Sequence, residues 1–360
     1  MSRMRIFAAL AAVAMAAACT EYKTAYAGEA APAQYKVLSP ISHGNLTIFP
    51  VVASTTRDTG QFLTLDEGIR SGEVIVNEAG RIQPLIRGNR PIPVRRGGDE
   101  VNRLVLVNNS DRPLLLLAGE IVTGGKQDRV IGKDRIVPAK SDPIDLSVFC
   151  VEPGRWVERS ANFNTLEGNM AQPSVRAKAM GDKDQQKVWD EVRSAHESMA
   201  AKVPAPARAE LAGTSSYAYT MDNGEVKKQV EEIAAPIDRD YSSLIRQLRD
   251  RRAVGVVAAV NGRIIWADLF ASSGLLESYW PKLVRSYAAE AMIGRASHKD
   301  ATVDAAQAFI DSLSGRHEVV ESDPGVYRHT EVTGDGFKVF ELTSLLPKTG
   351  FDVHIAKMEQ

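Results

Sequence analysis

The stretch that decides the fold is Leu104–Trp156, which reads LVLVNNSDRPLLLLAGEIVTGGKQDRVIGKDRIVPAKSDPIDLSVFCVEPGRW. Its apolar runs are short and are separated by turn residues such as those of Asn108–Asp111. None of the runs shows the period of a helix, so we expect strands at 104–107, 114–122, 129–131, 135–137 and 144–152. Many short strands at close spacing predict an antiparallel sandwich or barrel.

The β pattern extends toward the N-terminus of this stretch. Leu46–Val52 is rich in β-branched residues, and Glu73–Glu78 alternates between apolar and polar side chains. The sequence therefore predicts a β-rich domain over residues 35–156.

Downstream of Trp156 the pattern becomes mixed. Segment 162–173 is polar and irregular, whereas apolar residues at helical spacing predict helices at 183–202, 225–252, 275–296 and 302–313. We expect the second of these helices to break at Pro236, because proline removes a backbone donor. Strands return between His317 and Met358.

Asn261-Gly262 gives the clearest local signal. It separates two apolar runs, 253–260 and 263–270, and both of its residues tolerate the positive φ of a type I′ hairpin turn. Taken together, the patterns predict an α+β fold. An N-terminal antiparallel β-sandwich or barrel-like unit packs beside a mixed unit of helices and a β-hairpin, over residues 157–360.

The N-terminus has the pattern of an export signal. Arg3 and Arg5 precede an uncharged, mostly apolar run, Ile6–Ala18, that is shorter than the roughly 20 residues of a membrane-spanning helix. Two cleavage sites compete. Processing before Cys19 would remove residues 1–18 and leave a lipidated cysteine, whereas cleavage after Ala27 would remove residues 1–27.

Export predicts a periplasmic protein or a lipoprotein anchored in the outer membrane of a bacterium. Residues 28–34 then form a tether, and a lipid on Cys19 is the only membrane attachment that we expect. The composition is balanced, with 44% hydrophobic residues, 25% charged residues and a formal net charge of −1 over 360 residues. This balance gives no reason to expect nucleic acid as a partner.

Cys150 has no intramolecular disulfide partner once the leader is removed, because Cys19 is the only other cysteine. It lies in an apolar run, which favours a buried inert thiol over a nucleophile. No histidine between His43 and His196 is available along the sequence to activate it.

Several common kinds of site are missing from the sequence. The six histidines are scattered, so we predict no metal site and no cofactor. Gly119–Gln127 has glycines and a lysine but lacks the spacing, the Ser or Thr and the following helix of a phosphate-binding loop. No Gly-x-Ser-x-Gly elbow occurs.

What remains is a set of polar residues at the ends of predicted strands. Glu120 and Glu152 are the candidate catalytic residues. The candidate ligand-binding residues are Gly124, Gly125, Lys126, Gln127, Arg129, Arg155 and Trp156. The alternative is that these residues form an ion-paired network that holds turns together, for example through Glu120 with Arg129 or Arg155.

The same region carries a family resemblance. The run Leu116–Arg129, LLAGEIVTGGKQDR, and its continuation Pro138–Trp156 resemble the ARG and rhodanese-phosphatase-superfamily-associated protein domain. Asp268–Phe270 and Tyr279–Tyr287 fit too, so that the resemblance covers about residues 36–300. The family name records an association with ADP-ribosylglycohydrolase and phosphatase-type proteins. The family has no established reaction, so the resemblance implies no catalytic residues.

Two functional hypotheses follow. The first is an exported binding or structural module whose polar site takes a small polar ligand or an envelope protein. The second is a hydrolase-like enzyme acting on a nucleotide- or sugar-derived substrate. In it Glu120 or Glu152 would serve as general acid or base, and Lys126 or Arg129 would hold an anionic group.

Overall fold

A computed structural model describes residues 34–78, 103–154, 159–160, 162–247, 252–294, 300–312, 315–347 and 349–360. The predictions for the leader, Cys19, residues 28–33 of the tether, and Arg155 and Trp156 lie outside these residues. None of the described helices has both the length and the apolar character that crossing a membrane needs.

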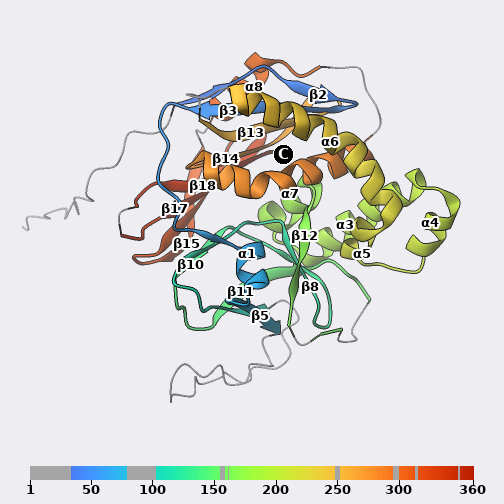
Figure 1. Ribbon diagram of the computed structural model, residues 1–360, viewed down its shortest axis with the longest axis horizontal. Helices are drawn as coiled ribbons and strands as arrows, with labels where there is room; N and C mark the ends of the chain where they lie inside the picture. The colour runs from blue at the N-terminus through green and yellow to red at the C-terminus, as the bar shows by residue number, and fades with distance from the viewer. Residues whose placement is uncertain are drawn as a thin grey trace, which may run out of the picture. The chain divides into compact units, whose positions relative to one another are not determined.

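A large antiparallel sheet forms one side of the fold (Figure 1). Within the described residues it has nine strands. Eight of them lie side by side in the order β1 (Tyr35–Val37), β3 (Leu46–Ala53), β13 (Ala253–Val260), β14 (Arg263–Phe270), β18 (Asp352–Glu359), β17 (Phe337–Ser344), β16 (Tyr327–Thr333) and β15 (Arg316–Asp323), and β2 (Ile41–His43) also pairs with β3.

The hairpin predicted at Asn261-Gly262 is confirmed. Asn261 has φ 56° and Gly262 has φ 75°, the positive values that a type I′ turn requires. Every residue of β13 is buried, because β3 and β14 flank it in the sheet and α7 packs across it. The turn therefore sets the register between two neighbouring interior strands of the large sheet.

The β-rich half consists of two further sheets. Over the described chain, six strands follow the order β12 (Asn164–Met170), β8 (Glu120–Thr123), β9 (Arg129–Ile131), β11 (Ile144–Cys150), β6 (Arg103–Asn108) and β5 (Val74–Glu78). Three more follow the order β10 (Arg135–Val137), β7 (Leu114–Leu116) and β4 (Leu63–Thr64), in which β4 and β7 are parallel. A core of leucine and valine side chains lies among these strands. The predicted α+β class with a β-rich part is confirmed.

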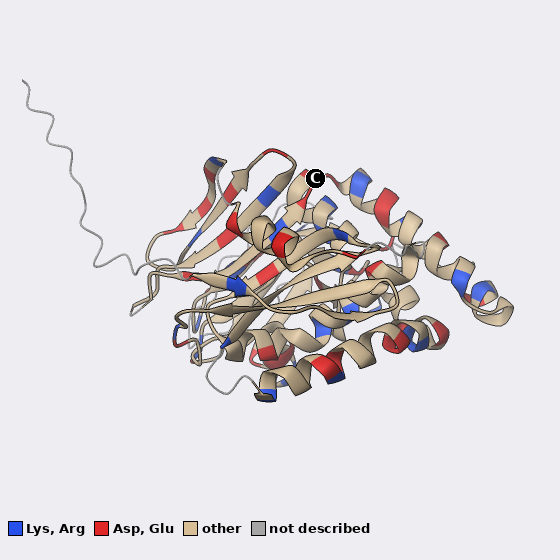
Figure 2. Cartoon of the chain, turned by 90° about the horizontal axis from the view of Figure 1, so that it is seen from above, with Lys and Arg blue, Asp and Glu red and all other residues tan. Residues whose placement is uncertain are grey.

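Helices cover the strands and connect the sheets. They are α1 (Leu65–Arg70), α2 (Pro173–Ala177), the π-helix η1 (Lys178–Asp182), α3 (Gln185–Lys202), α4 (Ala205–Leu211), α5 (Tyr217–Asp222), α6 (Gly224–Gln247), α7 (Ser273–Ile293) and α8 (Val303–Asp311). Helix α7 contacts β12 on one side and β13 on the other, so it lies between the β-rich half and the large sheet (Figure 1). Basic and acidic residues are interspersed along the helices (Figure 2).

Three local predictions are wrong. Helix α6 continues through Pro236, because its buried stripe, which includes Val230 and Ile237, packs on α7 and offsets the lost hydrogen bond. Segment 162–173 contains strand β12, which pairs with β8. The expected strand 114–122 is two strands, β7 and β8, because the chain turns at Gly119 with φ 97°.

The division into domains at residue 156 stays a prediction. Strands from both sides of that position share the large sheet, since β3 pairs with β13. The two parts on either side of residue 156 belong to one compact unit, Pro32–Gln360.

Gly119→Ala tests the turn that separates β7 from β8. A Cβ at this position would lie 2.7 Å from the Cγ atom of Arg176, and φ 97° is unfavourable for alanine. We expect the substitution to lower the free energy of unfolding by about 2–4 kcal/mol, measured by urea denaturation.

The matched control is Gly154→Ala. Gly154 has a similar φ of 93°, but a Cβ there would meet nothing within 4 Å. It should therefore report the backbone strain alone, about 1–2 kcal/mol. Equal losses for the two variants would show that the contact with Arg176 is unimportant.

Candidate functional site

Glu120 lies at the start of β8 with only 1% of its surface exposed. One carboxylate oxygen lies 2.8 Å from the Lys282 ammonium of α7, and the other accepts a hydrogen bond of 2.8 Å from the Leu117 N–H. Lys282 also lies 2.7 Å from a carboxylate oxygen of Asp66 in α1. This group of three charges links β8, α7 and α1. Glu120 therefore bonds to a residue of α7 and not to the turn that follows β8.

Lys282 is held in its charged form. Burial lowers the pKa of Lys282, but the carboxylates of Glu120 and Asp66 more than offset this effect, so the pKa lies above its usual value. The buried carboxylate of Glu120 and the partly buried carboxylate of Asp66 share one buried ammonium, so the members of this group depend on one another.

The turn after β8 gathers a second set of predicted residues. We call this set the polar turn: Gly124–Arg129 with Glu78 and Glu152. Asp128 accepts hydrogen bonds of 3.0 Å from both the Gly124 N–H and the Ser216 hydroxyl, and Glu152 accepts one of 3.3 Å from the Asp128 N–H. The polar turn thus joins β8, β9 and the end of β11 to the start of α5.

Glu78 closes the other side of the polar turn. It accepts a hydrogen bond of 2.9 Å from the Lys126 N–H, and its carboxylate lies 3.8 Å from the guanidinium of Arg129. Gly125, with φ 50°, is needed here, because a Cβ would come within 2.6 Å of the Glu78 carboxylate. Arg129 is fully buried and donates to the Gln127 carbonyl.

Gln127 is the exception in this cluster. Its side chain is fully buried, yet neither its amide oxygen nor its amide nitrogen has a hydrogen-bond partner among the described residues. A buried polar group left without a partner costs about 1–3 kcal/mol. Such a group is uncommon in folded proteins and calls for an explanation such as a ligand.

A third group of charged residues was not predicted as a site. Arg176 of α2 donates two hydrogen bonds of 2.9 Å to the carboxylate of Asp268 in β14. His354 of β18 lies between two carboxylates, with Nε2 3.2 Å from Asp268 and Nδ1 2.6 Å from Asp134. The Tyr287 hydroxyl also donates to Asp268. All five side chains are fully buried.

His354 carries a positive charge at neutral pH. Burial lowers its pKa, but Asp134 and Asp268 more than offset this effect and raise the pKa to about 9. Two cations, Arg176 and His354, therefore compensate two carboxylates inside the protein. The sequence signal for this group was Asp268, a single carboxylate in the otherwise apolar run 264–270.

Cys150 is buried among the described residues, and burial raises the pKa of its thiol to about 11. A thiol of this kind is protonated and inert at neutral pH, which argues against the nucleophile. Among the described residues, no group of three or more His, Cys, Asp or Glu side chains is arranged to hold a metal ion.

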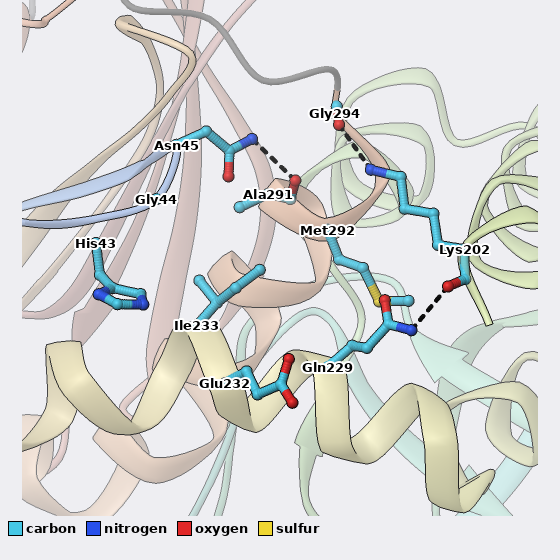
Figure 3. A pocket seen from close by; sticks show the side chains of 10 residues that line it. All are labelled: His43, Gly44, Asn45, Lys202, Gln229, Glu232, Ile233, Ala291, Met292 and Gly294. Atoms are coloured by element: carbon cyan, nitrogen blue, oxygen red, sulfur yellow. Dashed lines mark hydrogen bonds between the residues drawn. The ribbon is translucent and has the colours of Figure 1, made fainter. Parts of the chain in front are cut away.

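An open hollow of about 500 Å³ lies elsewhere, among the β2–β3 turn, α3, α6 and the end of α7 (Figure 3). Its polar walls are held by hydrogen bonds to backbone carbonyls, from Asn45 to Ala291 and from Lys202 to Gly294 (Figure 3). None of the predicted site residues lines it.

The ARG and Rhodanese-Phosphatase-superfamily-associated Protein domain matches residues 34–356. The chain belongs to this family. The matched range includes Glu120, the polar turn and the buried group around Asp268. Comparisons with curated proteins and with solved structures returned no match. The roles predicted for Glu120, Glu152 and the polar turn therefore stay predictions that must be argued from the chain itself.

The raised pKa of His354 predicts how the free energy of unfolding depends on pH. Its pKa rises from 6.5 in the unfolded chain to about 9 in the folded chain. Its contribution is therefore complete below pH 6.5, is lost as the pH rises through 9, and is on the order of 3 kcal/mol. We expect this loss in the free energy of unfolding of the wild type but not of His354→Gln, measured by urea denaturation from about pH 6 to about pH 9.5.

The comparison of the two proteins removes the contributions of other groups that titrate in this range. His317→Gln serves as a control, because His317 is exposed on β15. A difference between the wild type and His354→Gln that does not change with pH would contradict an imidazolium held between the two aspartates.

Proposed function

We propose that this family member is an exported binding protein of the bacterial envelope and that the polar turn binds a small polar ligand. The observation that carries the proposal is the buried Gln127 amide, which has no hydrogen-bond partner among the described residues. An amide side chain presents a donor and an acceptor side by side. It therefore suits a ligand group that offers both, such as another amide or the edge of a nitrogen heterocycle.

The charges around Gln127 support a polar ligand rather than an apolar one. Arg129 and Asp128 are its neighbours in the chain, and Glu152 bonds to the backbone of Asp128. The Gly124 and Gly125 positions, each with positive φ, let the backbone pass close to Asn162 and Glu78, which packs the polar turn tightly.

The contacts of Glu120 and Glu152 favour the binding hypothesis over the hydrolase hypothesis. A general acid or base must reach a proton on the substrate. Glu120 is fully engaged by Lys282 and Leu117, and Glu152 bonds to the Asp128 N–H and lies 3.4 Å from the guanidinium of Arg159. These contacts support a structural role for both carboxylates.

A thermal-shift screen of the mature protein against nucleotides, ADP-ribose and sugars tests this proposal. We expect at least one compound to raise the melting temperature of the wild type and not that of Gln127→Leu. We also expect Gln127→Leu without ligand to be more stable than the wild type by about 1–3 kcal/mol, because it no longer buries an unpaired amide.

Two further variants separate binding from structure. Gln186→Leu, at an exposed position of α3, should leave both the shift and the stability unchanged. Glu120→Gln should lower the melting temperature but keep the ligand-induced shift, because Glu120 bonds to α7. If no compound in the panel raises the melting temperature, the binding proposal is contradicted. If the protein turns over one of the compounds and Glu120→Gln abolishes that turnover, the hydrolase hypothesis is favoured.

The export part of the proposal rests on Arg3, Arg5 and the apolar run Ile6–Ala18. We expect the mature protein in the envelope fraction to begin at acylated Cys19 or at Gly28, determined by mass spectrometry of the intact protein. A full-length chain recovered from the cytoplasm would contradict export.

A further inference from the structure

A second, smaller cavity lies where the large sheet meets the β-rich half. It has a volume of about 190 Å³ and lies among η1, β11, the turn after β9, and strands β15–β17. Apolar side chains line much of it, including Phe149, Met180 and Phe340. The cavity shares no residue with the polar turn, so it is independent of the proposed function.

His329 of β16 lines this cavity and is the polar group that needs explaining. Only 1% of its surface is exposed, and neither ring nitrogen has a hydrogen-bond partner among the described residues. Burial lowers the pKa of His329, so its ring is neutral and offers one donor and one acceptor. Its ring centroid lies 6.3 Å from that of Phe340, which also lines the cavity.

Three charged residues line the cavity, namely Lys133, Lys183 and Glu331. Lys133 and Lys183 both line it, and each is paired with a glutamate, Lys133 with Glu321 and Lys183 with Glu331. Their side chains are 28% and 49% exposed, so both reach from the cavity toward solvent. Each lysine has three donors, and one glutamate does not exhaust them. An anionic group at the cavity mouth would gain hydrogen bonds from both.

The size and the lining restrict what can fill the interior. An engineered cavity of about 150 Å³ is large enough to bind benzene. A cavity of about 190 Å³ therefore accommodates a single ring with one small substituent, and not a two-ring compound. Aromatic and thioether side chains such as Phe149, Phe340 and Met180 favour an aromatic body.

We propose that this cavity binds a small aromatic monocarboxylate. The ring lies among Phe149, Met180 and Phe340, and the carboxylate accepts a hydrogen bond from His329 and interacts with Lys133 and Lys183. Ligand binding gives the buried imidazole the partner that the described residues do not supply.

Calorimetric titration of the mature protein tests this assignment, with benzoate as the probe and benzamide as its uncharged isostere. We expect saturable binding of one benzoate per chain and at least about tenfold weaker binding of benzamide. His329→Leu should weaken benzoate binding by at least about tenfold, whereas His317→Leu, at an exposed position, should not change it. Lys183→Met should weaken binding of benzoate more than that of benzamide.

Two results would overturn the proposal. One is the absence of saturable benzoate binding up to about 10 mM, which would identify a cavity that holds water only. The other is unchanged benzoate binding in His329→Leu. If His329→Leu does not fold, the nitrogen resonances of His329 in the wild type decide. They shift on addition of benzoate if the proposal is right and stay unchanged if it is wrong.

Discussion

The fold depends on the burial of one carboxylate, that of Asp268. Arg176, Tyr287 and His354 all bond to it, and they come from α2, α7 and β18. The Arg176 guanidinium also lies 4.4 Å from the centroid of the ring of Trp266, which precedes Asp268 by two residues in β14. Removing one partner of a buried ion pair costs about 3–5 kcal/mol, because the remaining charge is left uncompensated. The elements around β14 are therefore held in place together.

Local structure could be predicted from the sequence wherever the signal is itself local. Asn261-Gly262 fixes a turn through its own φ angles, and short β-branched runs predicted most of the strands. Pairing between distant strands has no such signal. The pairing of β3 with β13 depends on packing across more than half of the chain, and nothing within Leu46–Ala53 specifies that neighbour. The turn at Gly119 was missed because only Gly119 and Glu120 interrupt the apolar run from Leu114 to Val122.

The candidate site shows the same limit at the level of side chains. Glu120 and Gln127 are close in sequence, and together they suggested one polar site. In the structure Glu120 bonds to Lys282 of α7, whereas the Gln127 amide has no hydrogen-bond partner among the described residues. The partners of Asp268 and the environment of His329 come from distant segments, so no spacing rule could reveal them.

The position of β18 has a consequence for the order of folding. Asp352–Glu359 lies inside the large sheet, between β14 and β17, and supplies the imidazolium that bridges Asp134 and Asp268. Until this segment has been synthesised, a nascent chain can neither close the sheet nor neutralise both aspartates. Sheets built from such distant strands form slowly. The large sheet and the buried group around Asp268 therefore cannot be completed before Asp352–Glu359 is available, whereas the two sheets of the β-rich half contain no strand from this segment.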